Sequence, residues 1–210
     1  MKHIKIKRIS FVLPGKEVAL DVVDDVEALI TDLSDEDLVP CWAELWPSAR
    51  ALSRYVWENL ELGEQTLMEL GSGLGLPGVV CGVMGADVTF SDYNQEAVNL
   101  SIHNAEINGV KAKGYLGDWR HFSMESQFDW IMGSDIFYDP KLNPHVLKIF
   151  LKNLKPGGQL LISHQRRQPT YEFIAQVKQQ LKLQEIRVDS VDIDEESVFG
   201  KFSVSVHHLF

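Results

Sequence analysis

The strongest constraint on the fold is a regular alternation of strand and helix patterns that begins near residue 66. Short apolar runs at 66–70, 87–91, 113–116, 128–133 and 158–163 are separated by stretches whose apolar residues recur at helical spacing. Two further strand patterns follow at 184–188 and 202–209. Strands that alternate with helices pack as a parallel sheet covered by helices, so we expect a doubly wound, parallel α/β fold.

The residues before this alternation predict an N-terminal extension. Two β-branched runs flank Pro14 and Gly15, a pair typical of a hairpin turn, and residues 24–37 are acidic enough to form a loop or a short exposed helix. Pro47 suits the first turn of a helix, and the apolar spacing after it predicts a helix over 47–61. We therefore divide the chain into an extension of residues 1–62, packed on the core, and a domain of residues 63–210.

Composition supports a globular chain without a membrane segment. The 210 residues are 45% hydrophobic and 24% charged, which is typical of soluble globular proteins. No run approaches the roughly 18 apolar residues that span a bilayer, and no apolar block follows the basic start, so we expect no signal peptide. Cys41 and Cys81 form neither a disulfide framework nor a zinc spacing, which favours a reducing, cytoplasmic location.

The charge balance bears on partners. Twenty basic and thirty acidic residues give a net charge of -10. An acidic chain binds nucleic acid poorly through its phosphates and attracts basic partners at long range. The acidity is equally compatible with solubility alone, so charge does not decide between these readings. We expect no nucleic acid or membrane partner.

The most informative motif is the segment from Glu69 to Gly78, which reads Glu-Leu-Gly-Ser-Gly-Leu-Gly-Leu-Pro-Gly. It lies between a predicted strand and a predicted helix, where backbone N–H groups converge on a ligand and glycine allows close approach. Gly73, Gly75 and Gly78 also match the dinucleotide fingerprint, with Asp92 near the distance of a ribose-binding acid. A nicotinamide cofactor and a turn without ligand are therefore the alternatives.

Three features favour S-adenosylmethionine over a nicotinamide dinucleotide. Glu69 precedes the first glycine, where an acid would face the ammonium of a methionine moiety and repel a pyrophosphate. Asp92 ends the next strand, where it can take both ribose hydroxyls. The loop begins about a third of the way along the chain, and the single sheet that follows leaves little room for a separate substrate domain.

The Glu69–Gly78 loop resembles motif I of the class I, seven-β-strand methyltransferases, and Leu-Lys-Pro-Gly-Gly at 154–158 resembles the segment before their fifth strand. More specifically, the chain is similar to the lysine-methyltransferase-like group called methyltransferase family 16. Four segments carry this resemblance: Glu44–Ala49, the glycine loop, Gly117–Trp119, and Asp135–Tyr138, which matches the group's Asp-x-x-Tyr signature. The match is good over residues 40–165. It implies a Rossmann-like seven-stranded sheet with helices on both faces.

The resemblance also implies how the cofactor is held. Glu69 with Gly71, Gly73 and Gly75 would hold the methionine end, and Asp92 would hold the ribose. An alternative role for Asp92 is that of an acid at a helix N-terminus beside an Asn94 cap.

The adenine and the pocket entrance would be covered by aromatic residues. Tyr93 would cover one adenine face, Asp118 would meet the exocyclic amine and Trp119 would lie against the ring. Trp46 would close the pocket from the N-terminal side. Trp119 could instead be a packed loop aromatic, and Trp46 could be a core residue together with Trp42, one helical turn away.

The acceptor side is expected after the fourth strand, because open α/β sheets bind ligands at the carboxyl ends of their strands. Ser134 lies there on the cofactor side, and Asp135 and Tyr138 would line the acceptor entrance as the catalytic pair. His164, Arg166 and Arg167 could line the same rim, although solvated surface is favoured for the two arginines. His207 and His208 are weak metal candidates that fit a terminal strand better.

The leading hypothesis is a monomeric S-adenosylmethionine-dependent methyltransferase that acts on a lysine of a basic protein, by direct in-line transfer and without a metal. One alternative is a methyltransferase for a small metabolite, with the same cofactor site and a different rim. Another is a non-catalytic module that binds the cofactor or a protein. The intact Asp135-x-x-Tyr138 signature argues against the last.

Overall fold

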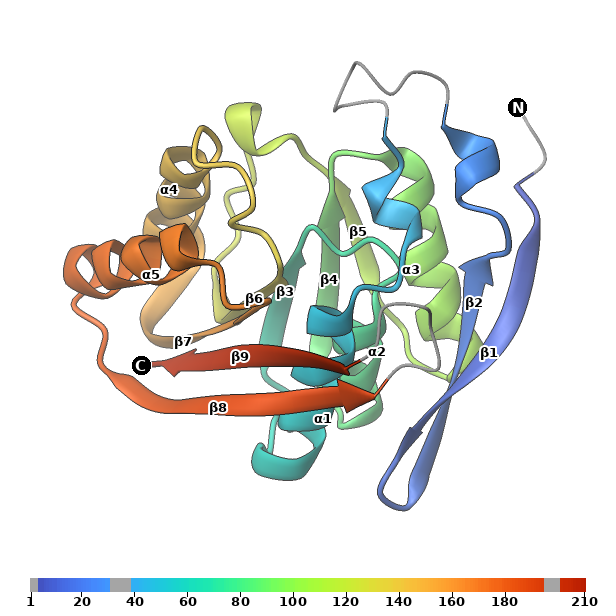
Figure 1. The fold of residues 1–210 in the computed structure, drawn as a ribbon. Helices are drawn as coiled ribbons and strands as arrows, with labels where there is room; N and C mark the ends of the chain where they lie inside the picture. Colours follow the sequence, from blue (N-terminus) through green and yellow to red (C-terminus); the bar gives the residue numbers. More distant parts are fainter. Residues whose placement is uncertain (1–3, 31–38, 195–200) are drawn as a thin grey trace.

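The computed structural model describes residues 4–30, 39–194 and 201–210 (Figure 1). Its centre is a seven-stranded sheet in the order β5-β4-β3-β6-β7-β9-β8, with helices on both faces. The strands are β3 (Thr66–Leu70), β4 (Asp87–Asp92), β5 (Lys113–Leu116), β6 (Phe128–Ser134), β7 (Leu154–His164), β8 (Glu185–Asp194) and β9 (Lys201–Leu209). The alternation in the sequence therefore predicted all seven strands, although β7 begins at Leu154 and not at residue 158, and β8 extends to Asp194 and not only to residue 188.

The expected α/β fold forms, and its sheet is parallel except at one strand. β9 runs antiparallel to both of its neighbours, β7 and β8, whereas the pairs from β5 to β7 are parallel. β8 and β9 follow each other in the element order and pair antiparallel with each other, as the two strands of a hairpin do.

The N-terminal hairpin forms as predicted. β1 (Ile6–Leu13) and β2 (Lys16–Val23) pair antiparallel, with Gly15 at a positive φ of 73° in the turn. After it, η1 (Glu27–Leu29) is a short 3-10 helix within the acidic stretch, whose residues 31–37 lie outside the described residues. The predicted helix over 47–61 is α1 (Pro47–Asn59), which ends when Leu60 becomes extended.

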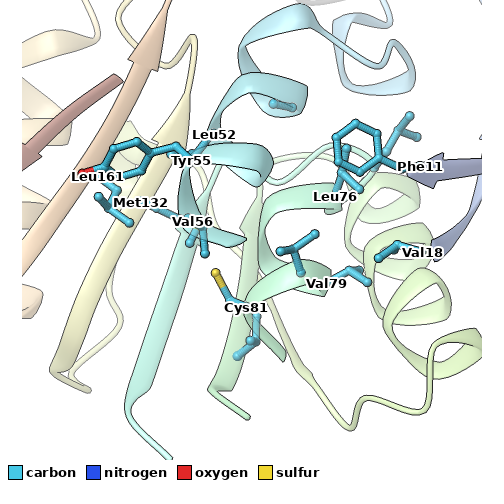
Figure 2. Packing of buried hydrophobic residues seen from close by; sticks show 14 of the residues in the cluster. Phe11, Val18, Leu52, Tyr55, Val56, Leu76, Val79, Cys81, Met132 and Leu161 are labelled. Carbon is cyan, nitrogen blue, oxygen red and sulfur yellow. The ribbon is translucent and has the colours of Figure 1, made fainter. Parts of the chain in front are cut away.

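Side chains of the central strands alternate between two hydrophobic cores. On one face, α1, α2 (Leu76–Val83) and α3 (Gln95–Ile107) cover the sheet, and the hairpin packs on α3. Figure 2 shows this core, with Phe11 from β1, Leu52 from α1 and Met132 from β6. On the other face lie α4 (Asn143–Asn153) and α5 (Gln168–Leu181).

The helix α1 also packs directly against β6, β7, β8 and β9. The division of the chain at residue 62 stays a prediction. Within the described ranges, no helix has the length and apolar character needed to cross a membrane.

Candidate cofactor and acceptor site

A cavity of about 490 Å³ lies at the carboxyl ends of β3, β4 and β6. It is closed from the N-terminal side by η3 (Cys41–Ala43) and the residues that lead into α1. Every predicted site residue except Glu69 lines it: Trp46, Gly71, Gly73, Gly75, Asp92, Tyr93, Asp118, Trp119, Ser134, Asp135 and Tyr138. Side chains that are far apart in the sequence therefore meet around one space.

The glycine loop is shaped by backbone conformation and by close packing. Gly71, Gly73 and Gly75 have positive φ angles of 62°, 49° and 78°. A Cβ on Gly73 would lie 2.9 Å from the backbone oxygen of Trp42, and a Cβ on Gly75 would lie 2.6 Å from the Cβ of Ser101. Both positions therefore exclude larger residues, and the bare backbone faces the cavity.

Glu69 lies behind this loop. Its carboxylate is only 1% exposed, and its Oε2 accepts a 2.8 Å hydrogen bond from the Gly78 N–H in the first turn of α2. Among the described residues its Oε1 has no hydrogen-bond partner, and burial raises the pKa of Glu69 to about 8. Glu69 thus ties β3 to α2, and its contact with a methionine ammonium stays a prediction.

Asp92, at the end of β4, is 4% exposed and holds the loop from the other side. Its Oδ2 accepts from the Gly73 N–H and its Oδ1 from the Asn94 N–H, each at 3.0 Å. Burial raises the pKa of Asp92, and these N–H groups oppose the shift. Asn94 caps α3 with its own side chain, as the sequence predicted, so the cap does not require Asp92.

The adenine-side candidates lie on the loop after β5. Asp118 caps η4 (Trp119–His121) by accepting from the Arg120 N–H, and its carboxylate pairs with the Arg120 guanidinium at 2.7 Å. This pairing lowers the pKa of Asp118. Trp119 packs against the glycine loop, since a Cβ on Gly71 would lie 3.3 Å from its ring. The indole is therefore both a packed side chain and part of the cavity wall.

Asp135 is the most constrained residue on the acceptor side. It has a φ of 53°, in the left-handed region that few residues other than glycine adopt. Its N–H donates to the Ser163 carbonyl at 2.8 Å, and its Oδ2 accepts from the Ser48 hydroxyl at 2.6 Å and from Gln165 Nε2 at 3.1 Å. These contacts from α1 and from the end of β7 hold its carboxylate at the cavity wall.

Tyr138 is 56% exposed and reaches the same cavity. Partial burial of its hydroxyl, together with nearby ionisable groups that include Tyr93, Cys41 and Asp92, raises the pKa of Tyr138 to about 12. The phenol therefore stays protonated at neutral pH and can donate a hydrogen bond.

Sequence reasoning missed some residues of the site. Ser48 lies within the Glu44–Ala49 segment that carried the resemblance, so its role could have been suspected. For Gln165, the only feature in the sequence that pointed to the site was its position just after the fifth predicted strand. Trp46 is 37% exposed, so it is not the core residue that was the alternative for it. Its indole N–H donates to the Cys41 carbonyl at 2.9 Å.

The expected rim position of His164 is wrong. Its side chain projects from β7 towards α5, where its ring contacts that of Tyr171, so only 1% of the residue is exposed. The ring also stacks on that of His207, with 5.1 Å between the ring centroids. Arg167 is exposed and lines the cavity, whereas Arg166 donates to Ser190. His207 and His208 lie in β9, the terminal strand that was favoured for them.

Comparison with known proteins agrees with this geometry. A family model described as lysine methyltransferase, methyltransferase family 16, matches residues 24–180. The chain belongs to this family. It is a class I S-adenosylmethionine-dependent methyltransferase, as the sequence predicted.

Curated relatives differ in the acceptors that their names give. The chain is 31% identical to a histidine protein methyltransferase 1 homolog of Dictyostelium discoideum over 67% of its own length, and the match spans 48% of that relative. It is 27% identical to a human histone-arginine methyltransferase, METTL23, over 73% of its own length and 87% of that protein.

A solved structure confirms the fold over nearly the whole chain. It is the 16S rRNA N2 G1207 methyltransferase of T. Thermophilus, in complex with AdoMet and guanosine. The TM-score is 0.67 at 17% identity, and the match covers 96% of this chain and 50% of that one.

Proposed function

We propose that this family member transfers the methyl group of S-adenosylmethionine to a lysine of a basic protein. The observation that carries the proposal is that Asp135 and Tyr138, the signature pair, line the same cavity as the glycine loop. One cavity can then hold the sulfonium end of the cofactor and the acceptor nitrogen together. The family description and the protein substrates named for the curated relatives support a protein acceptor.

The charge of the cavity wall supports a cationic acceptor. Its lining includes five acidic residues, Glu44, Asp92, Asp118, Asp135 and Asp139, and two arginines, Arg120 and Arg167. Arg120 is already paired with Asp118. Acids in excess on a partly enclosed wall raise the local concentration of a cationic side chain.

The cofactor side of the cavity would position the methyl donor. The glycine loop would hold the methionine end of S-adenosylmethionine, Asp92 the ribose, and Trp119 with Tyr93 the adenine. Trp46 would close the cavity, and Ser134 would lie between the cofactor and the acceptor. When bound, the cofactor supplies an electrophilic methyl group on a sulfonium.

The acceptor side would then place a lysine nitrogen in line, about 3–3.5 Å from the methyl carbon. A free lysine has a pKa near 10.4, so its nitrogen must release a proton to solvent before it can attack. Desolvation in the cavity would favour the neutral amine. Asp135 would capture the arriving ammonium, and the protonated hydroxyl of Tyr138 would orient the amine.

The acceptor class is tested by incubating the protein with methyl-labelled S-adenosylmethionine and a cell extract depleted of small molecules, and in parallel with the small-molecule fraction. The expected result is label in protein, recovered as methyl-lysine after hydrolysis. Label confined to small molecules, or methyl-arginine or methyl-histidine in place of methyl-lysine, would contradict the proposed acceptor and leave the cofactor assignment in place.

Tyr138→Phe tests the acceptor side separately. Because the hydroxyl would act on the acceptor alone, we expect turnover to fall about a hundredfold, the cost of a misplaced reactant, with S-adenosylhomocysteine affinity unchanged. Tyr115→Phe is the matched control, since that hydroxyl bonds Ser123 and does not line the cavity. Equal turnover by the two variants would remove Tyr138 from the mechanism.

A further inference from the structure

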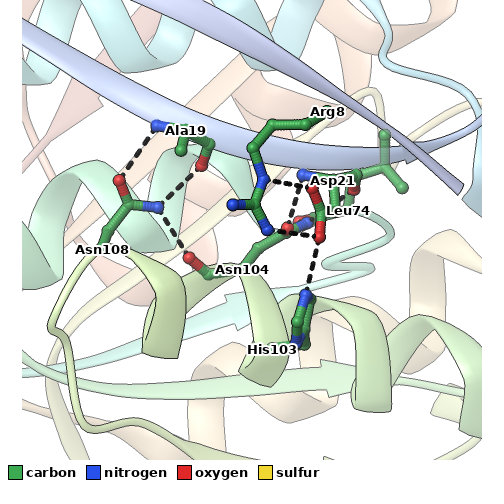
Figure 3. Close-up of polar contacts among 7 residues, drawn as sticks. All are labelled: Arg8, Ala19, Asp21, Leu74, His103, Asn104 and Asn108. Atoms are coloured by element: carbon green, nitrogen blue, oxygen red, sulfur yellow. Dashed lines mark hydrogen bonds and ion pairs between the residues drawn. The ribbon is translucent and has the colours of Figure 1, made fainter.

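The N-terminal hairpin is attached to α3 by two asparagines one helical turn apart (Figure 3). Asn104 Oδ1 accepts from the Asp21 N–H at 2.8 Å, and its Nδ2 donates to the Asp21 carbonyl at 3.1 Å. Asn108 makes the same pair of bonds with Ala19, at 3.0 and 2.7 Å. Asn104 and Asn108 are four helical residues apart, a rise of about 6 Å, and Ala19 and Asp21 are two strand residues apart, about 6.8 Å. Because these spacings nearly match, the two side-chain amides bond the backbone of β2 as a neighbouring strand would.

Asn104 differs from Asn108 in its second donor hydrogen. Asn104 Nδ2 also donates to the Leu74 carbonyl at 2.9 Å, whereas Nδ2 of Asn108, the residue that follows α3, donates to the Asn104 carbonyl at 2.7 Å. Leu74 lies between Gly73 and Gly75 and lines the cavity. Asn104 has no exposed surface, so water does not compete for these bonds. Of the two asparagines, Asn104 therefore connects the hairpin to the glycine loop.

Each of the three central residues of the loop, 73–75, is held by a hydrogen bond or by a packing contact. Asp92 accepts from the Gly73 N–H, Asn104 donates to the Leu74 carbonyl, and Gly75 packs on Ser101, one turn before Asn104 on α3. Asp92 and Ser101 belong to the sheet and its helix, whereas Asn104 is also bonded to β2.

The hairpin end of this connection is itself held by charge. The Asp21 carboxylate accepts two hydrogen bonds from the Arg8 guanidinium, at 2.7 and 2.9 Å, and contacts His103 at 2.8 Å. The bond to Arg8 is the main reason that the pKa of Asp21 falls to about 2. The carboxylate is therefore ionised at neutral pH, and it fixes the backbone that Asn104 binds.

We propose that Asn104 is a positioning residue for cofactor binding, through which docking of the hairpin sets the conformation of the glycine loop. The hairpin does not line the cavity, yet by this connection it contributes to cofactor affinity. The inference rests on the proposed role of the glycine loop in holding S-adenosylmethionine.

The first test compares Asn104→Asp with Asn108→Asp. Each change keeps the size and the accepting oxygen and replaces the donating Nδ2 with an oxygen that faces two carbonyls. Both should lower the melting temperature through the hairpin. By calorimetry we expect the Kd for S-adenosylhomocysteine to rise at least about tenfold for Asn104→Asp and less than about twofold for Asn108→Asp. Equal changes in Kd would overturn the proposal.

A second pair of variants uses exposed residues and does not depend on the fold tolerating a buried charge. Arg8→Met removes the two hydrogen bonds that the guanidinium donates to the Asp21 carboxylate. Lys7→Met removes the neighbouring ion pair with Asp24, which is not bonded to Asn104. We expect Arg8→Met to raise the Kd for S-adenosylhomocysteine at least about twofold, the size of a weak partly exposed ion pair, and Lys7→Met to leave it unchanged. Identical affinities would show that the hairpin does not act on the loop.

Asp92→Ala separates failure of this proposal from failure of the proposed cofactor site. If Asp92→Ala loses affinity while both Asn104→Asp and Arg8→Met retain it, the loop holds the cofactor and the connection through Asn104 is wrong. If Asp92→Ala also retains affinity, the assignment of the ribose to Asp92 is wrong, and if the unaltered protein binds no S-adenosylhomocysteine, the assignment of the loop itself is wrong.

Discussion

The two halves of the cavity are built in different ways. The cofactor half, at the ends of β3 and β4, is formed by backbone with positive φ angles and by the buried Asp92. The acceptor half, at the ends of β6 and β7, contains one residue with left-handed backbone, Asp135, and exposed side chains such as Tyr138, which is 56% exposed. Backbone cannot change without changing the fold, whereas exposed side chains can.

This difference explains how one fold serves relatives whose names give histidine and arginine as acceptors. The half proposed to hold the cofactor is fixed by packing, whereas exposed side chains in the half proposed to meet the acceptor can vary at little cost in stability. Changes in the backbone of the glycine loop should therefore affect stability and affinity together, and changes at exposed side chains of the acceptor half, such as Tyr138, should affect turnover alone.

The largest effect is expected for Gly75→Ala. Its Cβ would lie 2.6 Å from Ser101 Cβ, at a φ of 78°. Left-handed strain and overpacking together cost roughly 2–5 kcal/mol of unfolding free energy, and we expect binding of S-adenosylhomocysteine to be lost. Gly109→Ala is the control, because Gly109 has a φ of 76° but open space around it, so strain alone, roughly 1–2 kcal/mol, applies. Equal losses in the two variants would show that packing under the loop is not tight.

The second largest effect concerns pH and Glu69. The folded-state pKa of about 8 lies above the ordinary value of 4.5, so the folded protein holds a proton that the unfolded chain releases. Wild-type stability should therefore fall as pH rises from about 4.5 towards about 8, by roughly 1.4 kcal/mol for each pKa unit of the shift, and level off above it.

Glu69→Gln lacks this proton and can still accept from the Gly78 N–H. Its unfolding free energy, measured by urea melts of the apo proteins from pH 5 to pH 9, should rise relative to wild type across this window. Burial lowers the pKa of His164 to about 4, and its titration is common to both proteins and cancels in the difference. A difference that does not vary with pH would mean that Glu69 ionises normally.

Asp92→Ala should show an intermediate effect. Hydrogen bonds to a charged group contribute roughly 1.5–3 kcal/mol, so the Kd for S-adenosylhomocysteine should rise about ten- to a hundredfold. Asn94→Ala removes the cap of α3 and should cost about 1 kcal/mol of stability while leaving affinity nearly unchanged. If both variants bind equally well, Asp92 holds the glycine loop and does not bind the ribose.

The smallest effect is expected from ionic strength. If the acidic wall captures a cationic acceptor, the KM for that acceptor should rise a few-fold between low and physiological salt, since exposed charges are screened. The Kd for S-adenosylhomocysteine should hardly change, because the carboxyl groups proposed to hold its methionine end and its ribose, Glu69 and Asp92, are buried. A parallel response of both constants would remove the distinction between the two halves.

The glycine loop was the part of the cavity wall that the sequence predicted most directly. Glycines at a strand-to-helix junction can be recognised because left-handed backbone and close packing admit few other residues, as at Gly75. Asp135 was found through the signature, but its partners Ser48 and Gln165 were not, since those contacts depend on how α1 and β7 meet across the sheet. The burial of His164 was missed because strand periodicity does not say which face α5 covers.

The antiparallel position of β9 has a consequence for the order of folding. Translation delivers β8 before β9, yet β9 lies between β7 and β8 in the sheet. β8 therefore cannot join the sheet until β9 has been made. Until β9 pairs with β7, that edge of β7 has no partner strand. An unpaired strand edge is a template for association with other chains, so a delay at this step exposes the nascent protein to aggregation.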